Sequence, residues 1–394
     1  MKPKLADERA LAALERFEIE LPSWGFADTG TRFGKYPQPA AAHTLEEKFA
    51  DAAQVHRFTG CCPRLALHVL WDLPGGDARS ARELAERHGL RVGSLHPNLF
   101  QEPEYKHGSL ANELEPVREK ALAQVRETIR LAGELQCEEI SLWLADGSNY
   151  PGTADIRARR RRLETALQAA HAALQPGQRL LVEYKPFEPA FYHTDIADWG
   201  MALLLARAAG PRARVLVDTG HHYSGQNIEQ IVAWLLHEDM LGGFHFNDRR
   251  YADDDLTLGS IDPYQIFRIF AEIQAYEAER GLAAGLSYMI DQSHNLKPKI
   301  EAMLQTAMRA QELWAKAARV DYAALAEHRA AQRLIEAEET LQTAFWDDVR
   351  PLSRQWREAR GLPADPLAAF RASGYAELAA AARKHHHASG ASYA

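Results

Sequence analysis

The stretch that decides the fold is Val215-Leu216-Val217-Asp218-Thr219-Gly220-His221-His222. It begins with a β-branched, apolar run, which is typical of a buried parallel strand. The run ends at a carboxylate, and two histidines follow it almost at once. An α/β barrel places its functional side chains at this end of its strands. The letters Asp-Thr-Gly also suit an ordinary turn after a strand, so the stretch alone supports a site and a plain turn about equally.

The same arrangement recurs in three other segments, each an apolar run with a charged or imidazole side chain near its end. They are residues 180–186, 243–248 and 285–291, and they carry Glu183, His245 and Asp291. Glu183, Asp218 and His245 follow one another at close to the ~30 residues of a βα unit. The longer step to Asp291 leaves room for an inserted loop. A matched set at repeat spacing predicts four successive strands that present Glu, Asp, His and Asp on one rim of a barrel.

Four earlier segments have the same strand-like character, so eight strands are expected in all. They lie at residues 17–25, 64–72, 92–100 and 138–147, with helical patterns between them. Eight strands that alternate with helices predict an α/β fold, a (β/α)8 TIM barrel over residues 1–298. From residue 299 the sequence is rich in Ala, Glu, Arg, Leu and Gln and lacks strand patterns. We predict a C-terminal helical extension over residues 299–394 that serves oligomerisation or packs on the barrel.

The composition is ordinary for a soluble globular chain of 394 residues, with 46% hydrophobic and 25% charged residues. A formal net charge of −8 argues against a nucleic-acid partner, which would want a basic face. No apolar run approaches the ~20 residues of a membrane span, and the charged N-terminus lacks a signal-peptide core. Three cysteines, two of them adjacent, do not suit a disulfide framework. We therefore expect a cytoplasmic protein without membrane or nucleic-acid partners.

The predicted rim carries enough oxygen and nitrogen ligands for two divalent cations. The strand ends supply one expected group, which consists of Glu183, Asp218, His245 and Asp291. The loops that follow supply a second group, which consists of His221, Asp253 and Asp255, with Glu183 as the bridging ligand. Ligands of this kind without cysteine favour Mn²⁺, Mg²⁺ or Co²⁺ over a structural zinc ion. Lys185 follows Glu183 on the same side of its strand, where it can donate to a substrate oxygen.

Several aromatic side chains and one histidine near the strand ends are candidates for the walls of a pocket. His68 alternates with apolar residues of its strand, and Trp71 and Trp143 stand near strand ends. Phe33 lies in a long loop, residues 26–43, and loops of that length are uncommon unless they are functional or disordered. Each of these side chains could instead pack the barrel, and the sequence leaves both roles open.

Five motifs of the sequence, taken in order, resemble those of a known enzyme family. They are Glu183-Tyr184-Lys185-Pro186, Asp218-Thr219-Gly220-His221-His222, His245-Phe246-Asn247-Asp248, Asp253-Asp254-Asp255-Leu256-Thr257-Leu258-Gly259-Ser260 and Tyr288-Met289-Ile290-Asp291-Gln292-Ser293-His294. In these motifs the chain is similar to the L-rhamnose isomerases of the Pseudomonas stutzeri type, within the xylose-isomerase-like superfamily. The resemblance runs from about Phe17 to His294, and no motif matches in the C-terminal helices.

This resemblance implies an aldose–ketose isomerase of rhamnose catabolism that interconverts L-rhamnose and L-rhamnulose, with activity on L-mannose and L-lyxose. It implies a cytoplasmic homotetramer with two Mn²⁺ ions, for which Co²⁺ and Mg²⁺ are alternatives. The first ligand group would hold the substrate-binding ion and the second group the catalytic ion. The expected catalytic residues are Asp291, Lys185 and His221. The expected substrate-binding residues are His68, Trp71, Trp143, Lys185 and Phe33.

Other functions stay open at this stage. Another isomerase or epimerase of the superfamily fits the motifs, although an epimerase would need two opposed glutamates and only Glu183 is a clear rim glutamate. A metal-dependent phosphoesterase or nuclease would want more histidine ligands and a basic groove. A non-catalytic sugar-binding protein would not need the second metal group. For the isomerase itself, the sequence does not choose between a hydride shift and a cis-enediol with a carboxylate base such as Asp291.

Overall fold

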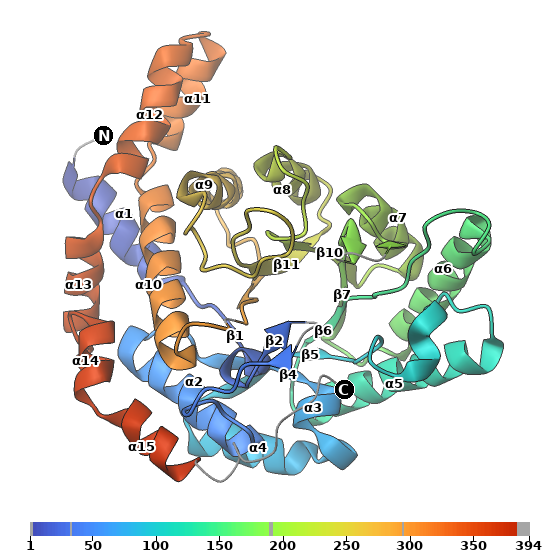
Figure 1. The fold of residues 1–394 in the computed structure, drawn as a ribbon. Coiled ribbons are helices and arrows are strands. Elements are labelled where there is room, and N and C mark those ends of the chain that lie inside the picture. Colours follow the sequence, from blue (N-terminus) through green and yellow to red (C-terminus); the bar gives the residue numbers. More distant parts are fainter. Residues whose placement is uncertain (1–2, 32–33, 189–191, 294, 384–394) are drawn as a thin grey trace.

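Eight parallel strands form a nearly closed barrel in the computed structural model, which describes residues 3–31, 34–188, 192–293 and 295–383 (Figure 1). In spatial order the strands are β1 (Leu21–Pro22), β4 (Arg64–His68), β5 (Arg91–His96), β6 (Glu139–Leu142), β7 (Arg179–Glu183), β10 (Ala213–Asp218), β11 (Leu241–Phe246) and β12 (Ser287–Ile290). The ring closes at Glu20, whose amide donates to Tyr288 O at 2.7 Å and whose carbonyl accepts from Ile290 N at 2.9 Å. The predicted TIM barrel with C-terminal helices is confirmed. Phe33 lies outside the described residues.

Helices surround the strands (Figure 1). They are α1 (Pro3–Arg16), α2 (Leu45–Thr59), α4 (Ala78–Arg87), α5 (Glu115–Glu134), α6 (Ile156–Ala173), α7 (Trp199–Ala209), α8 (Ile228–His237), α9 (Pro263–Arg280) and α10 (Lys299–Ala318). Helix α2 begins at a capping box, in which the side chains of Thr44 and Glu47 accept hydrogen bonds from each other's backbone N–H groups. After β12, α10 packs against α9, α2 and α1, so it continues the helical layer around the strands.

The alternation of side chains along β11 shows how the strands separate core from site. Phe244 and Phe246 are fully buried, and the Phe246 ring lies 5.2 Å from Phe270 of α9. His245, between them, turns to the opposite face and enters the barrel, where it is paired in register with Asp218 of β10. A strand sends successive side chains to opposite faces. Because the two phenylalanines pack outward against the helices, the histidine between them is directed into the mouth of the barrel.

The four earlier predicted strands end before the sequence pattern indicates, at Pro22, His68, His96 and Leu142, and two of them continue as helical turns. The segment at residues 64–72 leaves the strand at His68 and forms a helical turn, α3 (Val69–Asp72). The Asp72 carboxylate stabilises this turn, since it accepts from His68 N at 2.8 Å and pairs with Lys48 Nζ at 2.6 Å. The segment at residues 17–25 contains only β1 and continues as a 3-10 turn, η1 (Ser23–Phe26). As a result, Trp71 and Trp24 stand on helical turns rather than on strands.

Five further helices follow α10, in agreement with the predicted helical character of this region. They are α11 (Tyr322–Ala330), α12 (Leu334–Trp346), α13 (Arg350–Glu358), α14 (Pro366–Ala372) and α15 (Tyr375–Ala382). Figure 1 shows α11 and α12 projecting as a pair, while α13, α14 and α15 run along the side of the barrel. Arg383, after α15, forms a buried ion pair with Asp51 of α2, with Nη2 and Oδ1 2.9 Å apart. The last described helices are therefore fixed to one of the first.

Within the described ranges no helix is both long and apolar enough to cross a membrane. The three cysteines, Cys61, Cys62 and Cys137, are buried and free of disulfides, as the sequence predicts.

Candidate active site

Four neighbouring strands end at the carboxylates and the imidazole that the sequence singles out. Glu183 is the last residue of β7 and Asp218 the last of β10, while His245 lies inside β11 and Asp291 follows β12 directly. Parallel strands point their carboxyl ends to the same rim, so these side chains converge there. The structure brings all four together, with one ligand atom from each residue within 4.8 Å of the others.

His245 stands at the centre of this first group. Its Nδ1 lies 3.3 Å from Glu183 Oε2, 3.4 Å from Asp291 Oδ2 and 4.0 Å from Asp218 Oδ2. Asp291 is held from outside the group, because Trp24 Nε1 donates to its Oδ1 at 3.0 Å. Asp218 is held in the same way by Asn247, whose Nδ2 donates to Oδ1 at 3.0 Å. Both carboxylates thus keep Oδ2 for the centre of the group.

A second group consists of Asp218, His221 and Asp253. His221 Nε2 lies 3.3 Å from Asp253 Oδ1 and 3.9 Å from Asp218 Oδ2. The other ring nitrogen, Nδ1, faces the carbonyl oxygen of Tyr184 at 3.1 Å. A carbonyl can only accept, so the Nδ1 proton points there and the lone pair of Nε2 points into the group, as in histidine ligands of metal ions.

The sequence expectation and this geometry differ in which carboxylate is shared. Asp218 belongs to both groups, whereas the expected bridging ligand is Glu183. Glu183 contacts the other side of the imidazole, since its Oε1 lies 3.2 Å from His221 Nδ1, and its role as the bridging ligand remains a prediction. Asp255 lines the same cavity but is in neither group of converging ligand atoms. Its assignment as a metal ligand remains a prediction.

The ligand atoms fit divalent cations on their chemistry and on their lack of other partners. Asp218 Oδ2, His245 Nδ1 and Asp253 Oδ1 are buried without a hydrogen-bond partner, and all three point into the two groups. Buried polar atoms are normally satisfied, so orphaned atoms that converge on one place require an explanation. Burial raises the pKa of Asp218 to about 7, against the opposing effect of His221. An oxygen-rich set with imidazole and no thiolate is suited to Mn²⁺, Mg²⁺ or Co²⁺.

The two groups form the floor of a cavity of about 270 Å³. Its walls include aromatic and histidine rings, which are Trp24, His68, Trp71, His96, Phe100 and Trp143. The rings of His68 and Trp71 lie 3.9 Å apart, and those of Phe100 and Trp143 lie 4.9 Å apart. The structure therefore places the expected substrate-binding residues His68, Trp71 and Trp143 at this cavity.

Lys185 supplies the positive charge of the cavity. Its Nζ lies 2.8 Å from Asp253 Oδ2, 3.2 Å from Glu188 Oε2 and 4.9 Å from the centre of the Trp143 ring. Burial alone would lower the pKa of Lys185, but Asp253 and Glu188 outweigh it and raise the pKa above its usual range. The side chain is therefore a charged donor and is not suited to act as a base.

Several described side chains of the site escaped the sequence analysis, among them Phe100 on the cavity wall. Trp24 and Asn247 hold two of the candidate metal ligands, and His96 and Ser141 line the cavity. A signal existed for His96, which stands two residues after Ser94, so both polar side chains share one face of the strand. Trp24 gave no local signal, because it reaches Asp291 through a turn that a strand pattern does not predict.

Comparison with known proteins gives a consistent result. Residues 58–281 match the family model of the xylose isomerase-like TIM barrel. A probable sugar isomerase of Rhizobium meliloti is 37% identical over 377 residues, or 94% of this chain and 87% of the relative. Another, of Mesorhizobium japonicum, is 37% identical over 386 residues, or 96% and 89%. Among solved structures, a D-allulose 3-epimerase of Methylomonas sp. shares the fold, with a TM-score of 0.54 and 16% identity over 74% of this chain and 95% of that chain.

Proposed function

Because this chain belongs to the xylose isomerase-like TIM-barrel family, we propose that it is a metal-dependent aldose–ketose isomerase that interconverts L-rhamnose and L-rhamnulose. The observation that carries the proposal is the pair of converging ligand groups on the floor of a cavity with aromatic walls. The motif resemblance to L-rhamnose isomerases supports the choice of substrate. The same resemblance supports Mn²⁺ as the cation.

The cavity suits a ligand that carries several hydroxyl groups. Besides the candidate metal ligands, three buried polar atoms on the described lining have no hydrogen-bond partner, namely His68 Nδ1, Ser141 Oγ and Trp143 Nε1. They include both donors and acceptors, as are needed to pair with hydroxyls. The aromatic rings beside them offer flat apolar surface to the C–H face of a sugar. A monosaccharide combines these two features.

The charges of the cavity favour a neutral sugar. Among the described lining residues, Lys185 is the one lysine or arginine, and it is already paired with Asp253 and Glu188. A sugar phosphate or an acidic sugar would add negative charge next to several carboxylates without a free cationic side chain to receive it. We therefore infer that the substrate is an unphosphorylated aldose.

The reaction moves one hydrogen between C1 and C2 and one proton between O1 and O2. Bound divalent cations would polarise the substrate oxygens and stabilise the negative charge that develops on them. Lys185 would donate a hydrogen bond to O1 from its fixed position. Asp291 is the carboxylate we assign as the base of a cis-enediol route; Trp24 occupies its Oδ1, so the proton would go to Oδ2, whose basicity a bound cation would lower. The rings of Trp71 and Trp143 would form apolar walls against the sugar.

The test is an isomerase assay on purified protein after removal of metal. The metal-free protein should convert no L-rhamnose, and added Mn²⁺ or Co²⁺ should restore formation of the ketose. Full turnover after exhaustive EDTA treatment would contradict the metal-dependent mechanism. Metal binding without conversion of any aldose in a panel of pentoses and hexoses would contradict the assignment as an isomerase.

A second candidate is a related isomerisation or epimerisation of another sugar. The names of the two curated relatives favour it, because they specify a sugar isomerase but no sugar. Identification of the product by NMR separates the two, since an aldose–ketose isomerase changes the carbonyl position and an epimerase changes one stereocentre.

We also infer that the active form is a cytoplasmic homotetramer, as in the family that the chain resembles. Exposed apolar side chains on α12 support the idea of an interface there, with Leu334, Ile335 and Trp346 each more than two-thirds exposed. Light scattering of the purified protein measures the number of subunits.

A further inference from the structure

A buried hydrogen-bonded chain leads from the cavity into the centre of the barrel. Ser94 and His96 lie on the inner face of β5, and Ser94 Oγ is 3.0 Å from His96 Nε2. Ser94 Oγ is also 3.1 Å from Glu20 Oε1, which accepts a second hydrogen bond from Ser94 N. All three side chains are buried, and His96 lines the cavity beside His245 and Trp24.

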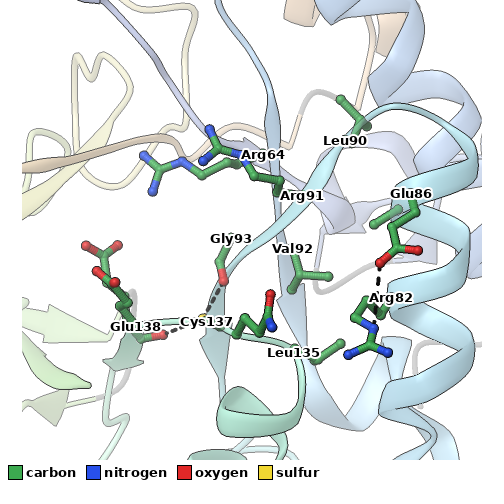
Figure 2. Close-up of a pocket in the computed structure, with 13 residues that line it drawn as sticks. Arg64, Arg82, Glu86, Leu90, Arg91, Val92, Gly93, Leu135, Cys137 and Glu138 are labelled. Atoms are coloured by element: carbon green, nitrogen blue, oxygen red, sulfur yellow. Dashed lines mark hydrogen bonds and ion pairs between the residues drawn. The ribbon is translucent and has the colours of Figure 1, made fainter. Parts of the chain in front are cut away.

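Gly93 makes room for this chain. A Cβ atom at this position would lie 1.6 Å from Glu20 Oε1, so any other residue would displace the carboxylate. Figure 2 shows Gly93 at the edge of a second cavity, at the N-terminal ends of β4, β5 and β6, with Arg64 and Cys137 beside it. Gly93 thus lies between that cavity and Glu20, and Cys137 Sγ, 2.5 Å from the Gly93 carbonyl oxygen, secures the strand there.

The hydrogen bonds of this chain favour one direction of donation. The backbone N–H of Ser94 can only donate, so Glu20 Oε1 is an acceptor whether or not the carboxyl carries a proton on Oε2. The Ser94 hydroxyl has a single proton and three possible acceptors, which are Glu20 Oε1 at 3.1 Å, His96 Nε2 at 3.0 Å and Met289 Sδ at 3.9 Å. We assign the proton to Oε1, because the backbone N–H of Ser94 already identifies this oxygen as an acceptor. With its proton directed to Glu20, Ser94 Oγ offers a lone pair to His96. Nε2 of His96 therefore donates, and the ring carries its proton there.

The other nitrogen of His96 is then an acceptor. His96 is buried, and among the described residues its side-chain hydrogen bond is to a hydroxyl and not to a carboxylate, which favours the neutral ring. A neutral imidazole with its proton on Nε2 has a lone pair on Nδ1. In the described part of the chain, Nδ1 of His96 has no hydrogen-bond partner of its own.

We propose that His96 is a substrate-positioning residue whose Nδ1 accepts a hydrogen bond from one hydroxyl of the ligand, and that Ser94 and Glu20 fix the tautomer that makes this possible. The proposal rests on the proposed function for the identity of the ligand as a sugar. It adds a specificity element to the site. Because His96 lies between His245 on the floor and Trp24 and His68 on the wall, it would read a hydroxyl between the reacting carbons and the far end of the sugar.

NMR of protein with ¹⁵N-labelled histidine and bound Mg²⁺, which is diamagnetic, tests the tautomer without any substrate. The resonances of His96 are identified by their loss in His96→Asn. We expect a pyridine-type signal for Nδ1 and a pyrrole-type signal for Nε2, and a mixture of tautomers in Ser94→Ala. A protonated Nδ1 in the unmodified protein overturns the proposal.

Kinetics test the effect on the ligand. Ser94→Ala should raise KM for the preferred aldose about tenfold, as expected for one weakened hydrogen bond, and leave kcat nearly unchanged, as for binding that is equal in ground and transition states. Ser109→Ala is the matched control, because Ser109 also donates from both N and Oγ to one buried carboxylate oxygen, Asp146 Oδ1, each at 2.7 Å. An equal rise of KM in both variants would show general loosening and overturn the proposal.

Single-deoxy derivatives of the aldose identify the hydroxyl. One derivative should bind about tenfold more weakly to the unmodified protein, and this penalty should vanish in His96→Ala. If every derivative loses as much affinity in His96→Ala as in the unmodified protein, His96 does not contact any of the tested hydroxyls, and the assigned contact is overturned. If no sugar in the panel is converted, the proposed function fails, whereas the NMR experiment still decides the tautomer.

Discussion

Replacement of Trp24 by phenylalanine tests how the candidate cation site is held. The indole Nε1 donates to Asp291 Oδ1 at 3.0 Å, and phenylalanine keeps a ring beside His68 and His96 but has no donor. A hydrogen bond to a charged group contributes about 1.5–3 kcal/mol, which corresponds to about 10–100-fold in an equilibrium constant. Loss of a group that orients a metal ligand typically weakens metal affinity by about the same factor. We therefore expect Trp24→Phe to bind Mn²⁺ about 10–100-fold more weakly.

Calorimetric titration of chelator-treated protein with Mn²⁺ measures this affinity directly. Turnover at saturating Mn²⁺ should largely recover, because the Asp291 carboxylate is still present. Trp356→Phe is the matched control, since the Trp356 indole also donates to a carboxylate, Glu15 Oε2 at 3.2 Å, among the helices outside the barrel. Unchanged Mn²⁺ affinity in Trp24→Phe, or an equal loss in the control, would refute the reasoning.

Four other outcomes are expected. Asp253→Ala should abolish turnover while calorimetry still detects sugar binding, because the first ligand group remains complete. Loss of sugar binding together with turnover would show that the first group does not bind the sugar independently of the second. Arg383→Met should destabilise the fold by about 3–5 kcal/mol in urea unfolding, because it leaves the buried carboxyl of Asp51 without its cation. Burial raises the pKa of Asp51 from 3.8 to about 6, so the folded state keeps this proton longer than the unfolded chain. Its contribution to stability is therefore full below about pH 4 and is lost as the pH rises to about 6, and Asp51→Asn should flatten this part of the profile. An aldose panel should show L-rhamnose as the best substrate with activity on L-mannose and L-lyxose, because an apolar wall discriminates a methyl or hydroxyl group by only about 1–3 kcal/mol; activity on a single sugar would point to polar recognition of the far end.

The strand ends of the site were predictable because repeat spacing and side-chain type agree there. Glu183, Asp218, His245 and Asp291 stand at the ends of apolar runs, and a barrel leaves such residues only one rim on which to meet. The expectation that residues at strand ends meet on one rim needs no knowledge of contacts between distant segments. For the same reason the (β/α)8 fold could be predicted without a structure.

What the sequence could not show depends on contacts between distant segments. The turn that carries Trp24 is secured by Ser23 Oγ, which donates to Asp72 Oδ2 at 2.5 Å, and by the close approach of Gly25 to Met303. Neither partner is near in sequence. Likewise, Asp218 rather than Glu183 meets Nε2 of His221 because a backbone carbonyl engages the other ring nitrogen.

The place of Asp218 in both ligand groups has a thermodynamic consequence. A single carboxylate that serves two cations links their binding, since the charge that attracts the first ion is partly neutralised when the second arrives. Loading would then occur in two steps at different concentrations of free ion, and turnover would follow the weaker step. Between the two steps the protein would hold one cation and would be folded but inactive, so the concentration of the free divalent cation would set the active fraction.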